Sequence, residues 1–284
     1  YDNQPYASFL EEICTNAFHE HPYRWVPIGD VQYIDQAKLH EFIEFHNHFY
    51  VPENAVLVIS GDIEYEKTKK LVEDYFGGIS RGGHEIYRPK IKEPPQMEEI
   101  RKTVYDNIQL PALFTSYRMP AMGDPDSYAL EMLQTLLSGG QSSRLYKALV
   151  DNKQLAMEAG AMPLILEDAG VFIIYGIANT EVKLEDLEAA VEEEITRVIE
   201  SGLTEREFQK LQNQTENDFI SRNTTMAGIS ESLANYYTFF GDANLINTEI
   251  ERYLAVTPEN IIDVARKYLV PENRVVLYYL PKEQ

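Results

Sequence analysis

The chain has 284 residues, of which 44% are hydrophobic and 25% are charged, as in a globular protein of one or two domains. Its formal net charge is −21, so its field repels nucleic acid and anionic lipid and argues against both as partners. No stretch approaches the roughly 20 apolar residues that span a bilayer, and the first residues lack the basic and apolar regions of a signal peptide. A periplasmic or cell-envelope location and a cytoplasmic one both fit the sequence.

The first part of the chain is predicted to be mainly helical. Apolar periodicity predicts helices at 6–19, 35–49 and 64–76, with a strand at 55–60. The only cysteine, Cys14, lies at helical spacing from Leu10 and Phe18, which favours a buried thiol. Gly77 and Gly78 should end the last of these helices.

Residues 77–96 have the glycines, prolines and basic residues of an interdomain linker. We set the linker itself at 81–96, between a first domain at 1–80 and a second domain at 97–284.

The second domain alternates strands and helices. Strands are predicted at 99–106, 111–118, 156–166, 170–178 and 273–280. Helices are predicted at 124–137, 142–150, 183–200, 204–223, 226–240, 243–254 and 258–268. This order indicates an α+β fold in which helices pack on one face of a mainly antiparallel sheet.

A repeat links the two domains. Residues 39–62 and 258–281 each read as an amphipathic helix, the tetrapeptide VPEN, and a strand. Proline cannot continue a helix and favours extended geometry in the residue before it, so VPEN suits a corner between helix and strand. The repeat therefore predicts tandem homologous domains. By its spacing, about 125 residues of the first domain are expected ahead of Tyr1, so that 1–80 is the C-terminal part of that domain.

The stretch FHEHPYRW contains the most obvious metal candidates, His19, Glu20 and His21. Side chains two positions apart on a helix point about 200° apart, so they converge only where the helix has ended. Zinc also needs three or four converging ligands with secured orientation. We therefore predict a capping or loop role for His21 and a solvated His19, without a metal.

The remaining histidines do not form a recognised metal motif. His40, His46 and His48 fall on a helix whose apolar residues explain its pattern better than metal binding does. Neither HExxH nor HxxEH occurs, and no histidine follows His84. The second domain is therefore expected to have a non-chemical role, with no catalytic or metal-binding residue.

The glycine pair Gly139-Gly140, followed by Gln141-Ser142-Ser143, resembles a phosphate loop only superficially. It follows a predicted helix instead of a strand, and it has no lysine at the required place. We interpret the glycines as a helix stop and Ser142 as the N-cap of the next helix.

Several segments together resemble the pitrilysin/insulinase (M16) family of zinc peptidases. They are DNQPY at 2–6, AFHEHPYRWVPIGD at 17–30, FYVPENAVLVISGDI at 49–63, YFGGI at 75–79 and LLSGGQSSRLYKAL at 136–149. The resemblance covers essentially the whole chain. It implies halves built from two homologous α+β domains. It also implies a zinc ion held by HxxEH and a later glutamate, all in the first domain and all ahead of Tyr1.

The resemblance implies one further site, and this chain departs from it. In the family half that does not bear zinc, the second domain usually supplies an arginine and a tyrosine to the substrate. The aligned positions here are Val150 and Met157. This departure suits the zinc-bearing half, and it equally permits a half that has become a scaffold.

The resemblance implies that the parent is a zinc-dependent endopeptidase which degrades or processes peptides inside a chamber. Its partners would be a peptide substrate and a second homologous half or partner subunit. The chain as given is expected to bind no zinc and to be inactive by itself. The alternative is a non-catalytic scaffold or assembly subunit of the same fold.

Overall fold

A computed structural model describes residues 4–282, so Asp2 and Asn3 of the DNQPY segment lie outside the described residues. The chain forms two compact units. Unit 1 comprises Tyr1–Pro27, Ile91–Thr215 and Glu251–Gln284, and unit 2 comprises Ile28–Lys90 and Glu216–Ile250.

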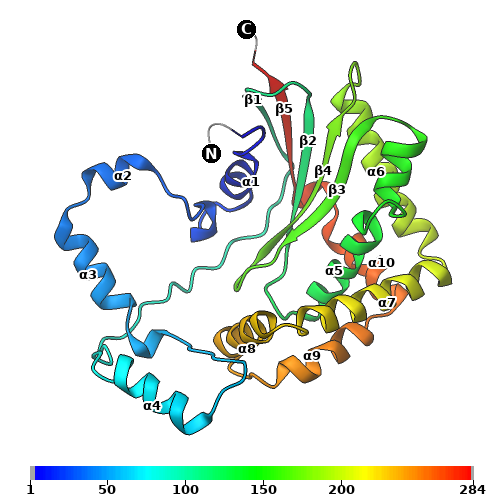
Figure 1. The fold of residues 1–284 in the computed structure, drawn as a ribbon. Helices are drawn as coiled ribbons and strands as arrows, with labels where there is room; N and C mark the ends of the chain where they lie inside the picture. Colours follow the sequence, from blue (N-terminus) through cyan, green and yellow to red (C-terminus); the bar gives the residue numbers. More distant parts are fainter. Residues whose placement is uncertain (1–3, 283–284) are drawn as a thin grey trace. The chain divides into compact units, whose positions relative to one another are not determined.

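Unit 1 is built around a five-stranded sheet of order β1-β5-β2-β4-β3 (Figure 1). The strands are β1 (Ile100–Asp106), β2 (Ala112–Met119), β3 (Ala156–Leu164), β4 (Gly170–Ala178) and β5 (Arg274–Pro281). Only β1 and β5 run parallel, and the other neighbouring pairs are antiparallel. The predicted α+β fold with a mainly antiparallel sheet is confirmed.

Helices cover one face of this sheet and form the larger core. They are α5 (Pro125–Ser138), α6 (Leu184–Ser201) and α10 (Pro258–Tyr268). Their apolar stripes supply Leu133, Leu187 and Ile261, all at 0% exposure. Beside them lies the π-helix η3 (Tyr146–Asn152), where an α-helix was predicted at 142–150. Seven residues are too few for the apolar pattern to distinguish the two helical periods.

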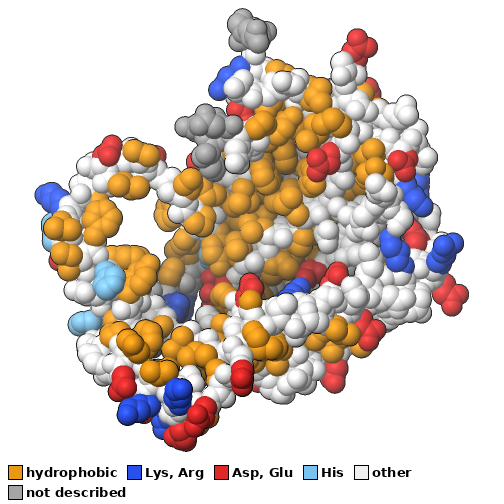
Figure 2. Space-filling model, viewed as in Figure 1, with side chains coloured by type: hydrophobic (Ala, Val, Ile, Leu, Met, Phe, Trp, Pro, Cys, Tyr) orange, Lys and Arg blue, Asp and Glu red, His pale blue; other side chains and the backbone are white. Residues whose placement is uncertain are grey.

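The opposite face of the sheet carries α1 (Phe9–Ala17), which packs on β2 and β5. Ile13 and Phe18 bury their side chains there against Phe114 and Tyr279. Figure 2 shows hydrophobic side chains gathered over the strands on this side. The helices are therefore not confined to one face, because the strands are apolar on both faces and each face needs a cover.

Cys14 is 4% exposed on α1, as predicted. Burial raises the pKa of its thiol to about 11. The thiolate, which is the reactive form, is therefore disfavoured at neutral pH.

Unit 2 contains α2 (Val31–Gln36), α3 (Leu39–Phe49), α4 (Tyr65–Phe76) and α8 (Met226–Phe240). The two remaining helices, α7 (Glu205–Arg222) and α9 (Leu245–Leu254), have residues in both units. The short helix α2 was not predicted, and the Asp30 side chain caps it by accepting from the Gln32 amide at 2.9 Å. Within 4–282, no helix is both long enough and apolar enough to cross a membrane.

Both VPEN segments form the same corner. Pro52–Asn54 and Pro271–Asn273 are 3-10 turns, each preceded by a valine in extended geometry. The strand predicted at 55–60 is wrong for the described residues: no ladder partner is assigned to it between residues 4 and 282, whereas Arg274–Pro281 is a central strand. A strand needs neighbouring backbone groups to pair with, and sequence pattern alone does not supply them.

Candidate functional site

His21 follows α1 and is the N-cap of the short helix η1 (Pro22–Arg24). Its side chain is 4% exposed, its Nδ1 accepts from the Tyr23 amide at 3.2 Å, and its Nε2 lies 3.4 Å from Asp168 Oδ2. Both ring nitrogens are therefore engaged in a cap and a contact with a loop. The predicted capping role of His21 is confirmed, and His19 is exposed as expected.

The backbone of the HEH segment binds a carboxylate from the predicted linker. Glu93 accepts from the amides of His19, Glu20 and His21 at 2.8, 2.9 and 2.7 Å. Burial raises the pKa of Glu93, but these three hydrogen bonds and Arg118 outweigh it and hold that pKa below its usual value. The segment that resembled a metal site is thus an anchor for the chain entering β1.

The other histidines lie in unit 2. His46 stacks on Tyr50 with ring centroids 5.2 Å apart, and His48 stacks on His84 at 5.7 Å. His40 is exposed on α3. Throughout residues 4–282, no three His, Cys, Asp or Glu side chains are grouped so that they could hold a metal ion. The donor sets present do not fit zinc.

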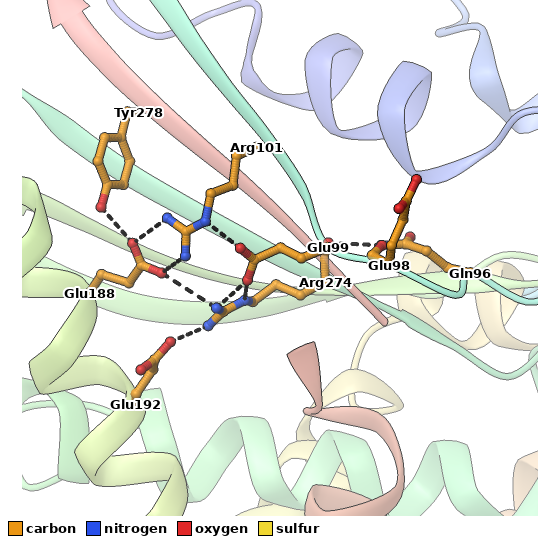
Figure 3. Close-up of polar contacts among 8 residues, drawn as sticks. All are labelled: Gln96, Glu98, Glu99, Arg101, Glu188, Glu192, Arg274 and Tyr278. Carbon is orange, nitrogen blue, oxygen red and sulfur yellow. Dashed lines mark hydrogen bonds and ion pairs between the residues drawn. The ribbon is translucent and has the colours of Figure 1, made fainter. Parts of the chain in front are cut away.

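A partly buried ion cluster joins β1, β5 and α6 in unit 1 (Figure 3). Arg274 is 7% exposed, donates from Nε to Glu99 at 2.7 Å and pairs through Nη1 with Glu192. Arg101 donates from Nη1 to Glu188 at 3.0 Å, and the Tyr278 hydroxyl donates to the same carboxylate at 2.5 Å. The cluster therefore contains two arginines, three glutamates and one tyrosine.

The cluster also holds the chain that leads into β1. The side chain of Gln96 donates to the carbonyl of Arg274 at 2.8 Å and to that of Glu98 at 2.9 Å. This arrangement fixes the approach to β1 against the start of β5.

Charge pairing sets the protonation states in the cluster. Burial raises the pKa of Glu99 and of Glu188, but hydrogen bonds from Arg101, with Arg274 at Glu99 and Tyr278 at Glu188, lower both below their usual value. The pKa of Tyr278 is raised by burial and by its bond to Glu188. Both carboxylates are thus ionised and already hydrogen-bonded, which suits a structural network and not an acid or base.

No local sequence pattern predicts this cluster. Its members come from three separate segments, and the only signal is an arginine at the first position of a strand, where the first copy of the repeat has Ala55.

The glycine pair ends α5 as predicted, with Gly139 as its C-cap and Gly140 at φ +88°. The prediction for Ser142 is wrong, because the following helical residues begin at Arg144 and Ser143 immediately precedes them. The hydroxyl of Ser142 instead lies 2.6 Å from Lys210 Nζ.

The two positions aligned with the family's substrate-binding pair lie in η3 and β3. Val150 is partly buried against the larger core, whereas Met157 is 57% exposed on β3, which is an edge strand of the sheet. Neither side chain offers a hydrogen-bond donor or charge to a peptide. Val150 and Met157 therefore cannot supply the charge and the hydrogen bond that the family's arginine and tyrosine give to a substrate.

A pocket of about 610 Å³ opens between α5, the end of α9 and α10 in unit 1. Tyr128 lines it and accepts from Arg252 at 2.9 Å, and Lys267 lies 2.6 Å from Asp126 at its wall. The other charged groups of the lining are bonded too, Arg252 to Tyr128 and Asp263 to Arg266, so the charged side chains of the pocket already have partners within the chain.

Comparison with known proteins places this fold in a class. Residues 37–215, more than half of the chain, match the family model described as the peptidase M16 inactive domain. The chain is 28% identical over 282 residues to the zinc protease PqqE of Helicobacter pylori, and the match covers 99% of this chain and 63% of that protein. An uncharacterised zinc protease of Mycobacterium leprae is 23% identical over 277 residues, which cover 94% of this chain and 60% of that one.

Solved structures agree with these matches. The crystal structure of a protease from H. pylori aligns with a TM-score of 0.91 at 27% identity, over 99% of this chain and 68% of that one. The crystal structure of a peptidase M16 inactive domain from Pseudomonas fluorescens aligns with a TM-score of 0.84 over 100% of this chain and 67% of that one. At 16% identity the latter shows the fold alone.

The fold and these matches define a metallopeptidase-type α+β protein. The chain belongs to the peptidase M16 family, with the family's inactive domain at residues 37–215. It spans 63% and 60% of the length of the two curated relatives, whose names identify them as zinc proteases.

Proposed function

We propose that this chain is the non-metal portion of a zinc-dependent endopeptidase. The observation that carries the proposal is the match over 99% of the chain to a protein named a zinc protease, together with the inactive-domain match at 37–215. Zinc in such a protein polarises the scissile carbonyl and lowers the pKa of its bound water. Because the described donors do not fit zinc, we place HxxEH, the glutamate ligand and the glutamate base outside this chain.

The role left to this chain is to enclose and orient a peptide. Unit 1 offers a rigid sheet with edge strands β1 and β3, on which an extended peptide can add as a further strand. A second homologous half or a partner subunit would close the chamber. With a net charge of −21, the walls favour basic peptides.

The test is hydrolysis by the full-length native protein. We expect cleavage of short quenched-fluorescence peptides that a zinc chelator abolishes and added zinc restores, with the purified 284-residue chain inactive as the control. A lysine-rich peptide should be cleaved faster than a glutamate-rich peptide of equal length, and the difference should shrink in salt. Chelator-insensitive cleavage, or zinc-dependent turnover by the chain alone, would overturn the proposal.

The replacement of the family's arginine and tyrosine by Val150 and Met157 favours one alternative, a non-catalytic scaffold or assembly subunit of the same fold. A full-length protein that binds no zinc and cleaves none of the peptides, yet co-purifies in a stable complex, would establish this alternative.

A further inference from the structure

The two edges of the sheet in unit 1 differ in charge. The edge strands are β1 and β3, and among residues 4–282 no further strand pairs with the outer side of either (Figure 1). On β1, the side chains of Arg101 and Lys102 are 47% and 44% exposed, and they pair with Glu188 and Glu12. Cationic side chains on an edge strand oppose the pairing of a further strand. We therefore examined β3 as the edge at which a peptide can pair.

The register with β4 fixes which side chains of β3 share a face. Met162 lies opposite Ile173, whose side chain belongs to the core under α1. Directly opposite residues share a face of the sheet, and side chains alternate between faces along a strand. Met162, Gly160 and Glu158 therefore form one row on the face that carries α1.

Glu158 supplies a carboxylate at one end of this row. It is exposed, and its Oε1 accepts from the Tyr175 hydroxyl at 3.0 Å. Burial and this hydrogen bond raise the pKa of Tyr175 to about 12, so the phenol keeps its proton and donates at neutral pH. The hydroxyl thus holds the carboxylate at the edge, where a cationic side chain of an added strand can pair with it.

Gly160 makes room for the ring that orients Glu158. A Cβ at this position would lie 2.8 Å from Tyr175 Oη and 2.9 Å from its Cε1. Any side chain at Gly160 would therefore displace the tyrosine. The glycine is thus part of the arrangement that presents the carboxylate.

Met162 is the apolar end of the row. Its side chain is 39% exposed, and the flexible thioether of methionine adapts to apolar partners of different shape. The next residue, Pro163, has no amide to donate to a further strand. The open edge therefore ends there, with the acidic and the apolar side chain four positions apart.

We propose that β3 binds an extended peptide that has a basic and an apolar side chain four residues apart. The basic side chain pairs with Glu158 and the apolar one packs on Met162, because positions four apart on a strand share a face and match this separation. The inference rests on the proposed function, for which it names the substrate class. It differs from a general attraction by the net charge of −21, which does not depend on spacing.

The first experiment varies the spacing at constant composition, with the full-length native protein. Quenched-fluorescence peptides of about ten residues in a serine and threonine background carry one lysine and one leucine, either four or three residues apart. Both orders are made, since an added strand can run in either direction. A spacing of three places the two side chains on opposite faces.

We expect kcat/KM to be about threefold to fivefold higher at the spacing of four than at three, in at least one of the two orders. Cleavage at equal rates for both spacings in both orders would overturn the proposal.

A matched pair of charge reversals tests the ionic pair. Glu158→Lys should lower the ratio of kcat/KM for the lysine peptide to that for the same peptide with glutamate by about tenfold. Glu200→Lys changes the net charge equally, but Glu200 is exposed on α6, on the opposite face of the sheet, and its ratio should stay near that of wild type. An equal fall in both variants would show that overall charge sets the preference, and would overturn the proposal.

Binding measured without hydrolysis separates this inference from the proposed function. Fluorescence anisotropy of the labelled peptides with the full-length protein, after zinc chelation, reports affinity alone. Tighter binding of the four-residue spacing by a protein that cleaves no peptide would support the site and contradict the peptidase. Zinc-dependent cleavage with no effect of spacing on rate or affinity would support the peptidase and overturn the site.

Discussion

Arg274 shows how strongly one residue depends on its partners in this fold. It is 7% exposed and lies against Glu99, Glu188 and Glu192. A buried charge is tolerated only where its partners and hydrogen bonds compensate for lost hydration. The cluster therefore holds β1, β5 and α6 in one arrangement and leaves no free group for chemistry.

We predict that Arg274→Gln destabilises the chain by about 1–3 kcal/mol, because Glu188 and the partly buried Glu99 each lose one of their two cationic partners. The measurement is urea unfolding at neutral pH, followed by circular dichroism. Arg266→Gln is the matched control, since Arg266 is 58% exposed and pairs only with Asp263 at the surface, where such pairs contribute about 0–1 kcal/mol. Equal losses for the two variants would contradict the structural role of the cluster.

A second residue-scale prediction concerns pH. Burial raises the pKa of Glu207, but hydrogen bonds from Arg144 and Thr204 outweigh it and lower that pKa to about 2. A depressed carboxyl pKa adds stability that is complete above the unfolded value of about 4.3 and is lost as pH falls through the folded value. Wild type should therefore lose stability from this group between about pH 4.3 and 2.

Glu207→Gln should flatten this part of the acid dependence. The check is the difference between urea midpoints at pH 7 and pH 3, which we expect to be smaller in Glu207→Gln than in wild type. Glu205→Gln, one position before Arg206 on the same helix, is the control and should behave as wild type. An unchanged difference in Glu207→Gln would refute the assignment.

At the scale of elements, the two VPEN corners share the same local hydrogen bond but differ in their contacts with the rest of the fold. Asn54 and Asn273 both close the corner by donating to a helix carbonyl. Asn273 additionally donates to the carbonyl of Arg118 on β2 at 2.8 Å, which ties the corner to the sheet. The side-chain oxygen of Asn54 instead accepts a hydrogen bond from Arg88 Nη2 at 2.7 Å, at an exposed position.

We therefore expect Asn273→Ala to cost more than Asn54→Ala in this chain. Losing a partly buried amide that serves two carbonyls should cost about 2–3 kcal/mol, against about 1 kcal/mol or less at the exposed corner. Urea unfolding of both variants measures the difference. A larger loss for Asn54→Ala would mean that the first corner contributes more to stability than the second.

The elements also show how far sequence pattern reaches. Nine predicted helices and strands of unit 1 were confirmed near their predicted ends, namely β1 to β5, α1, α5, α6 and α10, because amphipathic periods and caps are local signals. Residues 55–60 have a strand-like sequence but no assigned ladder, since pairing is a property of neighbours and not of the segment.

At the scale of the whole molecule, the two units differ in how much apolar surface they bury. Unit 1 contains both hydrophobic cores, whereas most large apolar residues between 28 and 90 are exposed, among them Tyr33, Phe45 and Tyr75. Stability follows buried apolar area, so unit 2 should open at lower free energy than unit 1.

We predict that limited trypsin digestion of the 284-residue chain cuts first between residues 28 and 90, where Lys67, Lys69 and Arg81 are available. Mass spectrometry of the early fragments identifies the sites. Residues of the sheet such as Arg118 should be cut only after prolonged digestion. Early cleavage at Arg118 would contradict this order of stability.

The sequence by itself determined the α+β class, the repeated corner, the family, the buried Cys14 and the capping role of His21. Each follows from short-range chemistry: apolar period, the geometry around proline, or a motif in fixed order. The domain boundaries at 80 and 97 and the placement of the catalytic residues outside this chain remain predictions.

Only the tertiary structure decided the strand order, the packing of α1 on the far face of the sheet, the binding of Glu93 to the HEH amides and the ion cluster at Arg274. These contacts join residues far apart in the chain. The packing of all the elements together determines which residues pair with a given strand, carboxylate or arginine. A local sequence pattern therefore does not predict these partners.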